Sequence, residues 1–287
     1  MGQAQAAAAF EAEATDQLSD KNFRRLAELI HGYSGIKMPP AKRTMLEGRL
    51  RRRMRACSIA ALDDYCAFLF EGQGLEGELV HLMDAVTTNK TEFFREPAHF
   101  DFIAQEVLPE LARSGRKTIK IWSAACSIGA EPYSLAMILE EHRREHGRQA
   151  YEILCTDLCT EVLAQAKAGK YAEAMVSPVP MELRRRYLRR SKDPRSDLVR
   201  IAPALRAQLS FARLNLMDEQ YPVERGLDLI FCRNILIYFD KPTQAKVLAR
   251  LCEHLRPGGY LFLGHSESIV GIDLPVAQTA NTVFRRA

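Results

Sequence analysis

The chain has 287 residues, a hydrophobic content of 47% and a formal net charge of +4. The chain is long enough for one large domain or two smaller ones. Because it has no run of about 18 apolar residues, we predict no membrane span. The seven cysteines are scattered without a C-x-x-C pair, so we expect buried, reduced thiols in a cytoplasmic protein, with no disulfide framework and no zinc site.

The N-terminal third predicts a small helical domain. Residues 1–18 are rich in alanine and lack the basic start of a signal peptide, so we expect them to be disordered or frayed. Four short amphipathic helices follow across residues 19–86 and can bury one another as a bundle. The first begins at Ser19 or Asp20, the second at Pro39 and Pro40, the third is capped by Ser58, and the fourth covers residues 75–86.

The second predicted helix is strongly basic. It has an apolar stripe of Leu46, Leu50 and Met54, and arginines fill its other faces. Between residues 37 and 57 the only acid is Glu47. Such a face is either a solvated helix surface or a binding surface for an acidic partner, and both interpretations stay open.

After a polar junction at residues 87–97, the chain alternates between strand-like and helix-like segments. We predict strands near 118–124, 151–156, 209–214, 227–232, 259–264 and 279–285, and helices near 131–145, 160–168, 180–190 and 242–255. This alternation predicts an α/β fold in which helices cover both faces of a mostly parallel sheet. Residues 178–209 are longer than a usual crossover connection, so we expect a small subdomain there.

Residues 119–132, IKIWSAACSIGAEP, combine a strand, a turn of small residues and a helix start. Small side chains and free N–H groups at a helix start let a polar ligand lie against the backbone. Open α/β folds hold nucleoside-type cofactors at this position. Since Ala125 and Ser127 stand where a dinucleotide fingerprint has glycine, we expect a cofactor without a pyrophosphate.

Polar residues also follow the ends of the neighbouring predicted strands. Asp157 either accepts both hydroxyls of a ribose or caps the next helix, and we favour the ribose. Glu131 either compensates the helix dipole or binds a cationic group, and these two roles are compatible. The other candidates at strand ends are Asn215, Leu216, Arg233, Asn234 and Tyr238.

Six strings occur in the order TTNKTEFFRE (87–96), SAACSIGAEPYS (123–134), TDLCTEVLAQAKAGKY (156–171), FARLNL (211–216), IFCRNILIYFD (230–240) and LRPGGYLFLGHSES (255–268). Together they resemble the CheR family of chemotaxis receptor glutamate methyltransferases, which use S-adenosylmethionine. The resemblance implies a class I S-adenosylmethionine-dependent methyltransferase domain (98–287), with a Rossmann-like mostly parallel sheet and a small antiparallel β insert (178–209). It also implies an N-terminal all-α domain (19–86) and a linker (87–97) that contributes to the cofactor site.

The resemblance further implies individual roles. The implied S-adenosylmethionine contacts are Asn89, Thr91, Arg95, Glu131, Asp157, Asn215, Leu216, Arg233 and Asn234. Arg95 and Tyr238 are the catalytic candidates, for holding a carboxylate and for the sulfur end of the pocket. In the family the basic helix is held to meet acidic methylation helices of receptors, which implies substrate-binding roles for Arg49, Arg52 and Arg53.

A sulfonium is an activated methyl donor, and an ionised carboxylate is already a nucleophile, so the implied reaction needs no general base and no metal. We expect a monomeric enzyme of sensory signal transduction that neither enters the membrane nor binds nucleic acid. Two alternatives remain: a nucleic-acid methyltransferase whose basic helix binds phosphates, and a non-catalytic module that binds S-adenosylmethionine or S-adenosylhomocysteine. The first should carry a motif such as Asn-Pro-Pro-Tyr where this chain has RNILIY (233–238).

Overall fold

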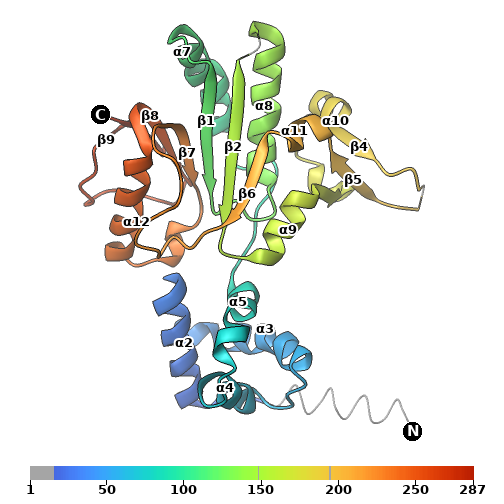
Figure 1. Ribbon diagram of the computed structural model, residues 1–287, viewed down its shortest axis with the longest axis vertical. Coiled ribbons are helices and arrows are strands. Elements are labelled where there is room, and N and C mark those ends of the chain that lie inside the picture. Colours follow the sequence, from blue (N-terminus) through green and yellow to red (C-terminus); the bar gives the residue numbers. More distant parts are fainter. Residues whose placement is uncertain (1–15, 148, 194) are drawn as a thin grey trace. The chain divides into compact units, whose positions relative to one another are not determined.

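The structure is a computed structural model that describes residues 16–147, 149–193 and 195–287. It divides into two compact units, with the boundary between Thr88 and Asn89 (Figure 1). The first unit is helical and the second is an α/β unit, and each is described by itself. Residues 1–15, for which we expect disorder or fraying, lie outside the described residues.

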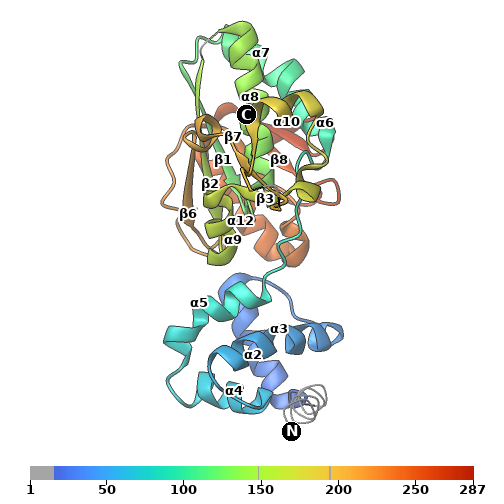
Figure 2. The same ribbon diagram turned by 90° about the vertical axis from the view of Figure 1, so that its right-hand side faces the viewer.

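The first unit contains α2 (Asp20–Ser34), a 3-10 turn (Pro40–Lys42), α3 (Arg43–Ala56), α4 (Leu62–Phe70) and α5 (Leu75–Val86), coloured blue to turquoise in Figure 2. These are the four predicted helices, which are confirmed. The predicted stripe of α3 points into the core, since Leu46 and Leu50 are fully buried and Met54 is nearly so.

Two details of this unit differ from the sequence-based expectation. Ser58 has φ 57° in the turn after α3, so it does not cap α4. The first N–H of α4, on Leu62, instead donates to Oδ2 of Asp16 at 2.8 Å. Leu18 is 3% exposed, and its N–H donates to Oε1 of Glu47 at 3.0 Å. Residues 16–18 therefore pack against the helices rather than fray, because they cap one helix and cover another.

The second unit is built on a seven-stranded sheet with the order β6-β2-β1-β7-β8-β10-β9. Its strands are β1 (Thr118–Ala124), β2 (Ala150–Asp157), β6 (Leu209–Arg213), β7 (Leu227–Cys232), β8 (Leu255–Leu263), β9 (Val276–Ala280) and β10 (Val283–Arg286). Neighbouring strands from β6 to β8 are parallel, whereas β10 is antiparallel to both β8 and β9. The single strand predicted at 279–285 is a hairpin, because the chain turns at Thr282, where φ is 54°.

The helices of this unit are α6 (Pro97–Phe102), a π-helical turn (Ile103–Val107), α7 (Leu108–Arg113), α8 (Ala130–His146), α9 (Thr160–Ala168) and α12 (Lys241–His254). Alternate side chains of β7 enter two different cores. Leu229 and Phe231 pack with residues of α7 and α8, while Ile230 and Cys232 pack with residues of α12. The predicted mostly parallel sheet with helices on both faces is thus confirmed. Among the described residues, no helix is long and apolar enough to cross a membrane.

A second, antiparallel sheet has the order β3-β5-β4. Its strands are β3 (Lys170–Ala172), β4 (Leu188–Arg190) and β5 (Leu198–Ile201), accompanied by a 3-10 turn (Glu173–Val176), α10 (Met181–Tyr187) and α11 (Pro203–Arg206). In Figure 1 this sheet lies beyond α8 and α9, on the side away from β8 and β9. The predicted small antiparallel insert is confirmed, and its first strand, β3, precedes residue 178.

Candidate active site

The order of the main sheet reverses at β1, which has β2 on one side and β7 on the other. Where the order reverses, the connections after adjacent parallel strands run to opposite faces and leave a crevice at the carboxyl ends. The segments that follow β1, β2 and β7 therefore meet at this edge of the sheet. Most of the residues predicted to bind a cofactor lie in these segments.

The turn after β1 has an unusual backbone. Ala125, Ser127 and Gly129 have φ values of 64°, 51° and 87°, all in the left-handed region. Residues other than glycine are uncommon there, and such residues concentrate at functional sites. A Cβ on Gly129 would lie 3.0 Å from Cβ of Ala166, so the turn also packs closely against α9. This backbone carries the chain directly into α8, whose first turn contains Glu131.

Asp157 ends β2 and is 7% exposed. Its Oδ2 accepts the N–H of Ser127 at 2.8 Å, and its Oδ1 accepts the N–H of Cys159 at 2.9 Å. Ser127 in turn donates through Oγ to the carbonyl of Asn89 at 2.9 Å. One carboxylate thus connects the turn after β1 to the start of α9.

Arg233 follows β7 and donates hydrogen bonds to three other residues of the site. Its Nη1 donates to Oε2 of Glu131 at 3.1 Å, and its Nη2 donates to Oε2 of Glu96 at 2.9 Å. Nη2 also donates to the carbonyl of Arg95 at 2.6 Å. Only 2% of the Arg233 side chain is exposed. Breaking such a buried charge pair by removing one partner typically costs about 3–5 kcal/mol, because the remaining charge stays buried.

Glu96 and Glu131 respond differently to this environment. Burial opposes ionisation of Glu96, but hydrogen bonds from Arg233 and Asn234 outweigh it and lower its pKa to about 2. For Glu131 burial dominates and raises the pKa, although Arg233 and a 2.7 Å hydrogen bond from Oγ of Ser123 oppose the shift. Their surroundings therefore favour the ionised form of Glu96 and disfavour that of Glu131.

Glu267 connects the segment after β8 to the segment after β7. Its Oε2 accepts the N–H groups of Gly264 at 2.6 Å and Asn234 at 2.9 Å, and its Oε1 accepts the N–H of Leu236 at 2.7 Å. The side chain of Asn234 donates to Oε1 of Glu96 at 3.1 Å. Asn234, with φ 59°, is thus held both through its main-chain N–H and through its side chain.

The predicted cofactor residues fall into two groups. In one group, hydrogen bonds through Ser127 join Asn89 to Asp157. In the other, hydrogen bonds of Arg233 and Glu96 join Arg95, Glu131 and Asn234. The guanidinium of Arg95 donates to the carbonyl of Lys90 at 3.2 Å, so the Arg95 main chain makes the contact with Arg233. Asn215 and Leu216 follow β6 and are 8% and 7% exposed, and Tyr238 is partly buried in the 3-10 turn Leu236–Tyr238.

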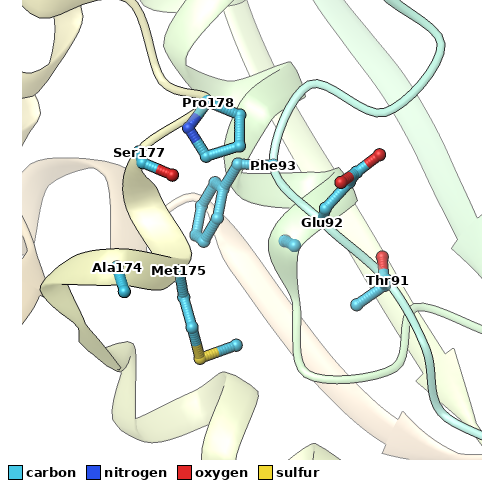
Figure 3. Close-up of a pocket in the computed structure, with 8 residues that line it drawn as sticks. Thr91, Glu92, Phe93, Ala174, Met175, Ser177 and Pro178 are labelled. Carbon is cyan, nitrogen blue, oxygen red and sulfur yellow. The ribbon is translucent and has the colours of Figure 1, made fainter.

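Thr91 belongs to a pocket of about 200 Å³ in the α/β unit. The lining residues are Thr91, Glu92, Phe93, Ala130, Ala174, Met175, Ser177 and Pro178. Figure 3 shows the ring of Phe93 pointing toward the segment of Met175 and Ser177, while the Glu92 carboxylate points away from that ring. Because Ala130 begins α8 next to Glu131, this pocket lies beside the crevice.

The three arginines predicted to bind substrate lie on α3 of the helical unit. Arg53 donates from Nε and Nη2 to the two carboxylate oxygens of Glu78 at 2.7 and 2.9 Å. Arg49 donates to the carbonyl of Thr87 at 2.8 Å. Arg52 is exposed, so it presents its charge on the surface of α3.

Four residues of the α/β unit were missed from the sequence: Glu96, His99, His265 and Glu267. Glu96 lies in the string TTNKTEFFRE, and His265 and Glu267 lie in LRPGGYLFLGHSES. The sequence signal that could have identified them is an acid or a histidine directly after a strand or before a helix. The sequence could not predict that Glu96 pairs with Arg233, because Arg233 lies 137 residues further along the chain.

Comparison with known proteins agrees with this geometry. The family model described as CheR methyltransferase, SAM binding domain, matches residues 89–284, and the one described as CheR methyltransferase, all-alpha domain, matches residues 21–87. The chemotaxis protein methyltransferase of Borreliella burgdorferi is 37% identical over 253 residues, which cover 86% of this chain and 88% of the relative. Those of Klebsiella aerogenes and Escherichia coli are 39% and 38% identical, covering 93% of this chain and 90% and 91% of the relatives. The predicted resemblance is therefore confirmed: the chain belongs to the CheR methyltransferase family and is an S-adenosylmethionine-dependent methyltransferase.

Proposed function

We propose that the protein transfers the methyl group of S-adenosylmethionine to glutamate side chains of chemoreceptors and forms glutamate methyl esters in sensory adaptation. Its relatives are named chemotaxis protein methyltransferases, which supports the choice of substrate. The observation that carries the proposal is the convergence of Glu131, Asp157 and Arg233 at the carboxyl ends of three adjacent strands.

The donor set of the crevice fits S-adenosylmethionine. Asp157 offers two carboxylate oxygens for the ribose hydroxyls, and the Glu131 carboxylate suits the ammonium group of the methionine part. Nε of Arg233 is buried and has no hydrogen-bond partner among the described residues, so it is a donor that a ligand can use. Asn215 and Leu216 would provide an amide and an apolar surface for the adenine. When bound, the cofactor supplies a sulfonium methyl group that needs no further activation.

The protein's own contribution is positioning. A glutamate carboxylate has an ordinary pKa near 4.3 and is ionised at neutral pH, so the substrate needs no general base. The hydrogen bond from Arg233 to Glu131 fixes the segment after β7 relative to the segment after β1. Fixed positions would favour in-line attack of the substrate carboxylate on the methyl group. Partial removal of water from the incoming carboxylate raises its reactivity. We assign Arg95 to the orientation of a carboxylate and Tyr238 to the sulfur end of the site.

For the partner, we propose the acidic helical domain of a receptor on the cytoplasmic side, bound by the basic face of α3. Arg52 would act directly on that surface. Arg49 and Arg53 would add charge while their side chains serve the helical unit. The enzyme would act as a monomer in the cytoplasm, without membrane insertion and without nucleic acid.

The test uses the full chain with methyl-labelled S-adenosylmethionine and a receptor cytoplasmic fragment. The matched control is the same fragment with every methylation-site glutamate changed to glutamine, and RNA and DNA are offered in parallel. We expect base-labile label on the glutamate fragment alone. Label on nucleic acid would favour a nucleic-acid methyltransferase. Calorimetric binding of S-adenosylhomocysteine without label on any acceptor would favour a non-catalytic module.

A further inference from the structure

Glu96, His99 and His265 form a cluster next to Arg233. One possible ligand atom from each side chain lies within 4.8 Å of the other two. Oε2 of Glu96 is 3.7 Å from Nδ1 of His99 and 3.8 Å from Nε2 of His265. The two imidazole rings pack edge to face, with centroids 5.3 Å apart. A carboxylate and two imidazoles therefore converge from α6 and its N-cap and from the segment after β8.

His99 has the hydrogen-bond pattern of a metal-binding histidine. Its ring is 2% exposed, and Nε2 lies 3.3 Å from the carbonyl of Asn281 and 3.0 Å from Oγ1 of Thr282. Because a carbonyl can only accept, Nε2 carries the hydrogen and Nδ1 presents its lone pair. Nδ1 is buried, has no hydrogen-bond partner among the described residues and faces Glu96. Histidine ligands of metals are commonly oriented by such a bond from the opposite ring nitrogen.

We propose that Glu96, His99 and His265 bind a divalent transition-metal ion, for which Zn²⁺ is well suited. Imidazole and carboxylate ligands match Zn²⁺ and its neighbours in the first transition row, whereas Mg²⁺ and Ca²⁺ prefer sites made of oxygen alone. Metal–ligand bonds of about 2.0–2.1 Å in a tetrahedral site place ligand atoms roughly 3.3 Å apart. The 3.7 Å between Oε2 of Glu96 and Nδ1 of His99 needs only a small contraction. The half-exposed His265 side chain can move to shorten its own separations from these two residues, which are at most 4.8 Å.

The metal would compete with the cofactor. Oε2 of Glu96, the oxygen nearest both histidines, is also the acceptor for Nη2 of Arg233. A bound cation would share this oxygen and repel the guanidinium, so it would disturb Arg233 and, through Oε1 of Glu96, also Asn234. This coupling rests on the proposed cofactor site. By linkage, the cofactor must weaken metal binding by the same factor by which the metal weakens cofactor binding.

The sequence predicts no metal for methyl transfer, because the implied reaction needs none. The metal proposed here would regulate the enzyme rather than catalyse its reaction. The cluster was not visible in the sequence because Glu96 and His265 are 169 residues apart.

We would test the site by titrating the full chain with Co²⁺, which reports its coordination by visible absorption. The background protein carries His146→Ala and Cys57→Ser. These changes remove the second possible histidine pair, since His142 and His146 have ring centroids 4.7 Å apart, and the one cysteine of the described residues that is not buried. We expect one equivalent of Co²⁺ to bind, and His265→Ala in this background to lower the affinity at least about tenfold.

His265→Ala is a mild change, because the side chain is 45% exposed and the main-chain N–H to Glu96 remains. His81→Ala, which removes an exposed histidine of the helical unit, is the matched control and should leave the titration unchanged. Equal Co²⁺ affinity with and without the His265 side chain would overturn the proposed site.

The coupling is tested by repeating the titration with saturating S-adenosylhomocysteine. We expect Co²⁺ affinity to fall at least about fivefold. An unchanged affinity would overturn the coupling. If calorimetry shows no binding of S-adenosylhomocysteine, that result counts against the proposed function. The Co²⁺ titration in the absence of S-adenosylhomocysteine still decides whether the metal site exists.

Discussion

Gly264 and Asn234 are in such close contact that no side chain fits between them. A Cβ atom on Gly264 would lie 2.3 Å from Nδ2 of Asn234 and 2.9 Å from its main-chain nitrogen. That same Nδ2 donates to Glu96, which pairs with Arg233. The absence of a side chain at the end of β8 is therefore a condition for the geometry of the segment after β7.

Gly264→Ala should displace Asn234 and weaken cofactor binding. We expect a loss of stability of about 1–3 kcal/mol from overpacking and an S-adenosylhomocysteine affinity at least about tenfold lower in calorimetry. The control is Gly77→Ala, since Gly77 is exposed on α5 and a Cβ there meets nothing within 4 Å. That change should stabilise the helix by about 0.5–1 kcal/mol. Normal cofactor affinity in Gly264→Ala would show that Asn234 has no part in binding.

Asp157→Asn should reduce cofactor affinity strongly. The amide keeps the shape of the side chain but loses the charge, and a hydrogen bond to a charged group contributes roughly 1.5–3 kcal/mol. This corresponds to a dissociation constant roughly 10- to 150-fold higher. Thermal unfolding must be measured as well, because Asp157 also accepts the N–H groups of Ser127 and Cys159. Asp101→Asn, an exposed position of α6, serves as control, and an affinity like that of this control would reject the ribose contact.

Arg95→Ala and Tyr238→Phe separate positioning from binding. Arg95→Ala leaves the carbonyl that accepts from Arg233, so the fold should persist while the proposed charge contact is lost. We expect turnover to fall at least about tenfold, with a smaller change in S-adenosylhomocysteine affinity. Tyr238→Phe should lower turnover less than Arg95→Ala, since it removes a single hydroxyl. Turnover within about twofold of the unmodified enzyme in both variants would remove both residues from the reaction site.

Arg52→Glu should weaken the interaction with the receptor without affecting the cofactor. We expect the KM for a receptor fragment to rise and its salt dependence to decrease, because one surface charge changes sign. Arg225→Glu is the matched control, since Arg225 is 73% exposed and lies in the α/β unit. If the two variants have the same KM for the receptor, α3 does not carry the proposed surface.

The pair of Arg53 and Glu78 should make the helical unit sensitive to acid. Burial opposes ionisation of Glu78, but hydrogen bonds from Arg53 and Tyr65 outweigh it, so its pKa lies below the ordinary value of 4.5. A lowered folded-state pKa means that the stabilisation is present above the unfolded-state pKa and is lost as the pH falls through the folded-state pKa. Glu78→Gln should remove this contribution at neutral pH.

Hydrogen exchange of peptides from α3 and α5, measured in the full chain, checks this expectation. The difference in protection between the unmodified protein and Glu78→Gln should be large at neutral pH and shrink as the pH falls below about 4.5. Glu76→Gln, an exposed acid of the same helix, should show no such difference. A difference that stays constant with pH would contradict the role of the charge.

Much of the architecture is readable from local sequence alone. Helices such as α9 and strands such as β1 and β7 begin and end where the periodicity predicts, because side-chain spacing within one segment decides which face is apolar. The position of Asp157 at a strand end is also local, so its place at the crevice follows once the sheet is known to be parallel. The family resemblance rests on such local strings as well.

Contacts between distant segments were decided by the tertiary structure. The sequence shows Arg53 on a basic helix, but only the packing of α5 against α3 brings Glu78 to it and turns a predicted surface charge into an internal ion pair. Likewise Arg233 meets Glu96 and Glu131 only after the strands are ordered in the sheet. Periodicity records which side of its own segment a residue faces. Periodicity does not indicate which residue of another segment this residue will contact, because that depends on how the segments pack in three dimensions.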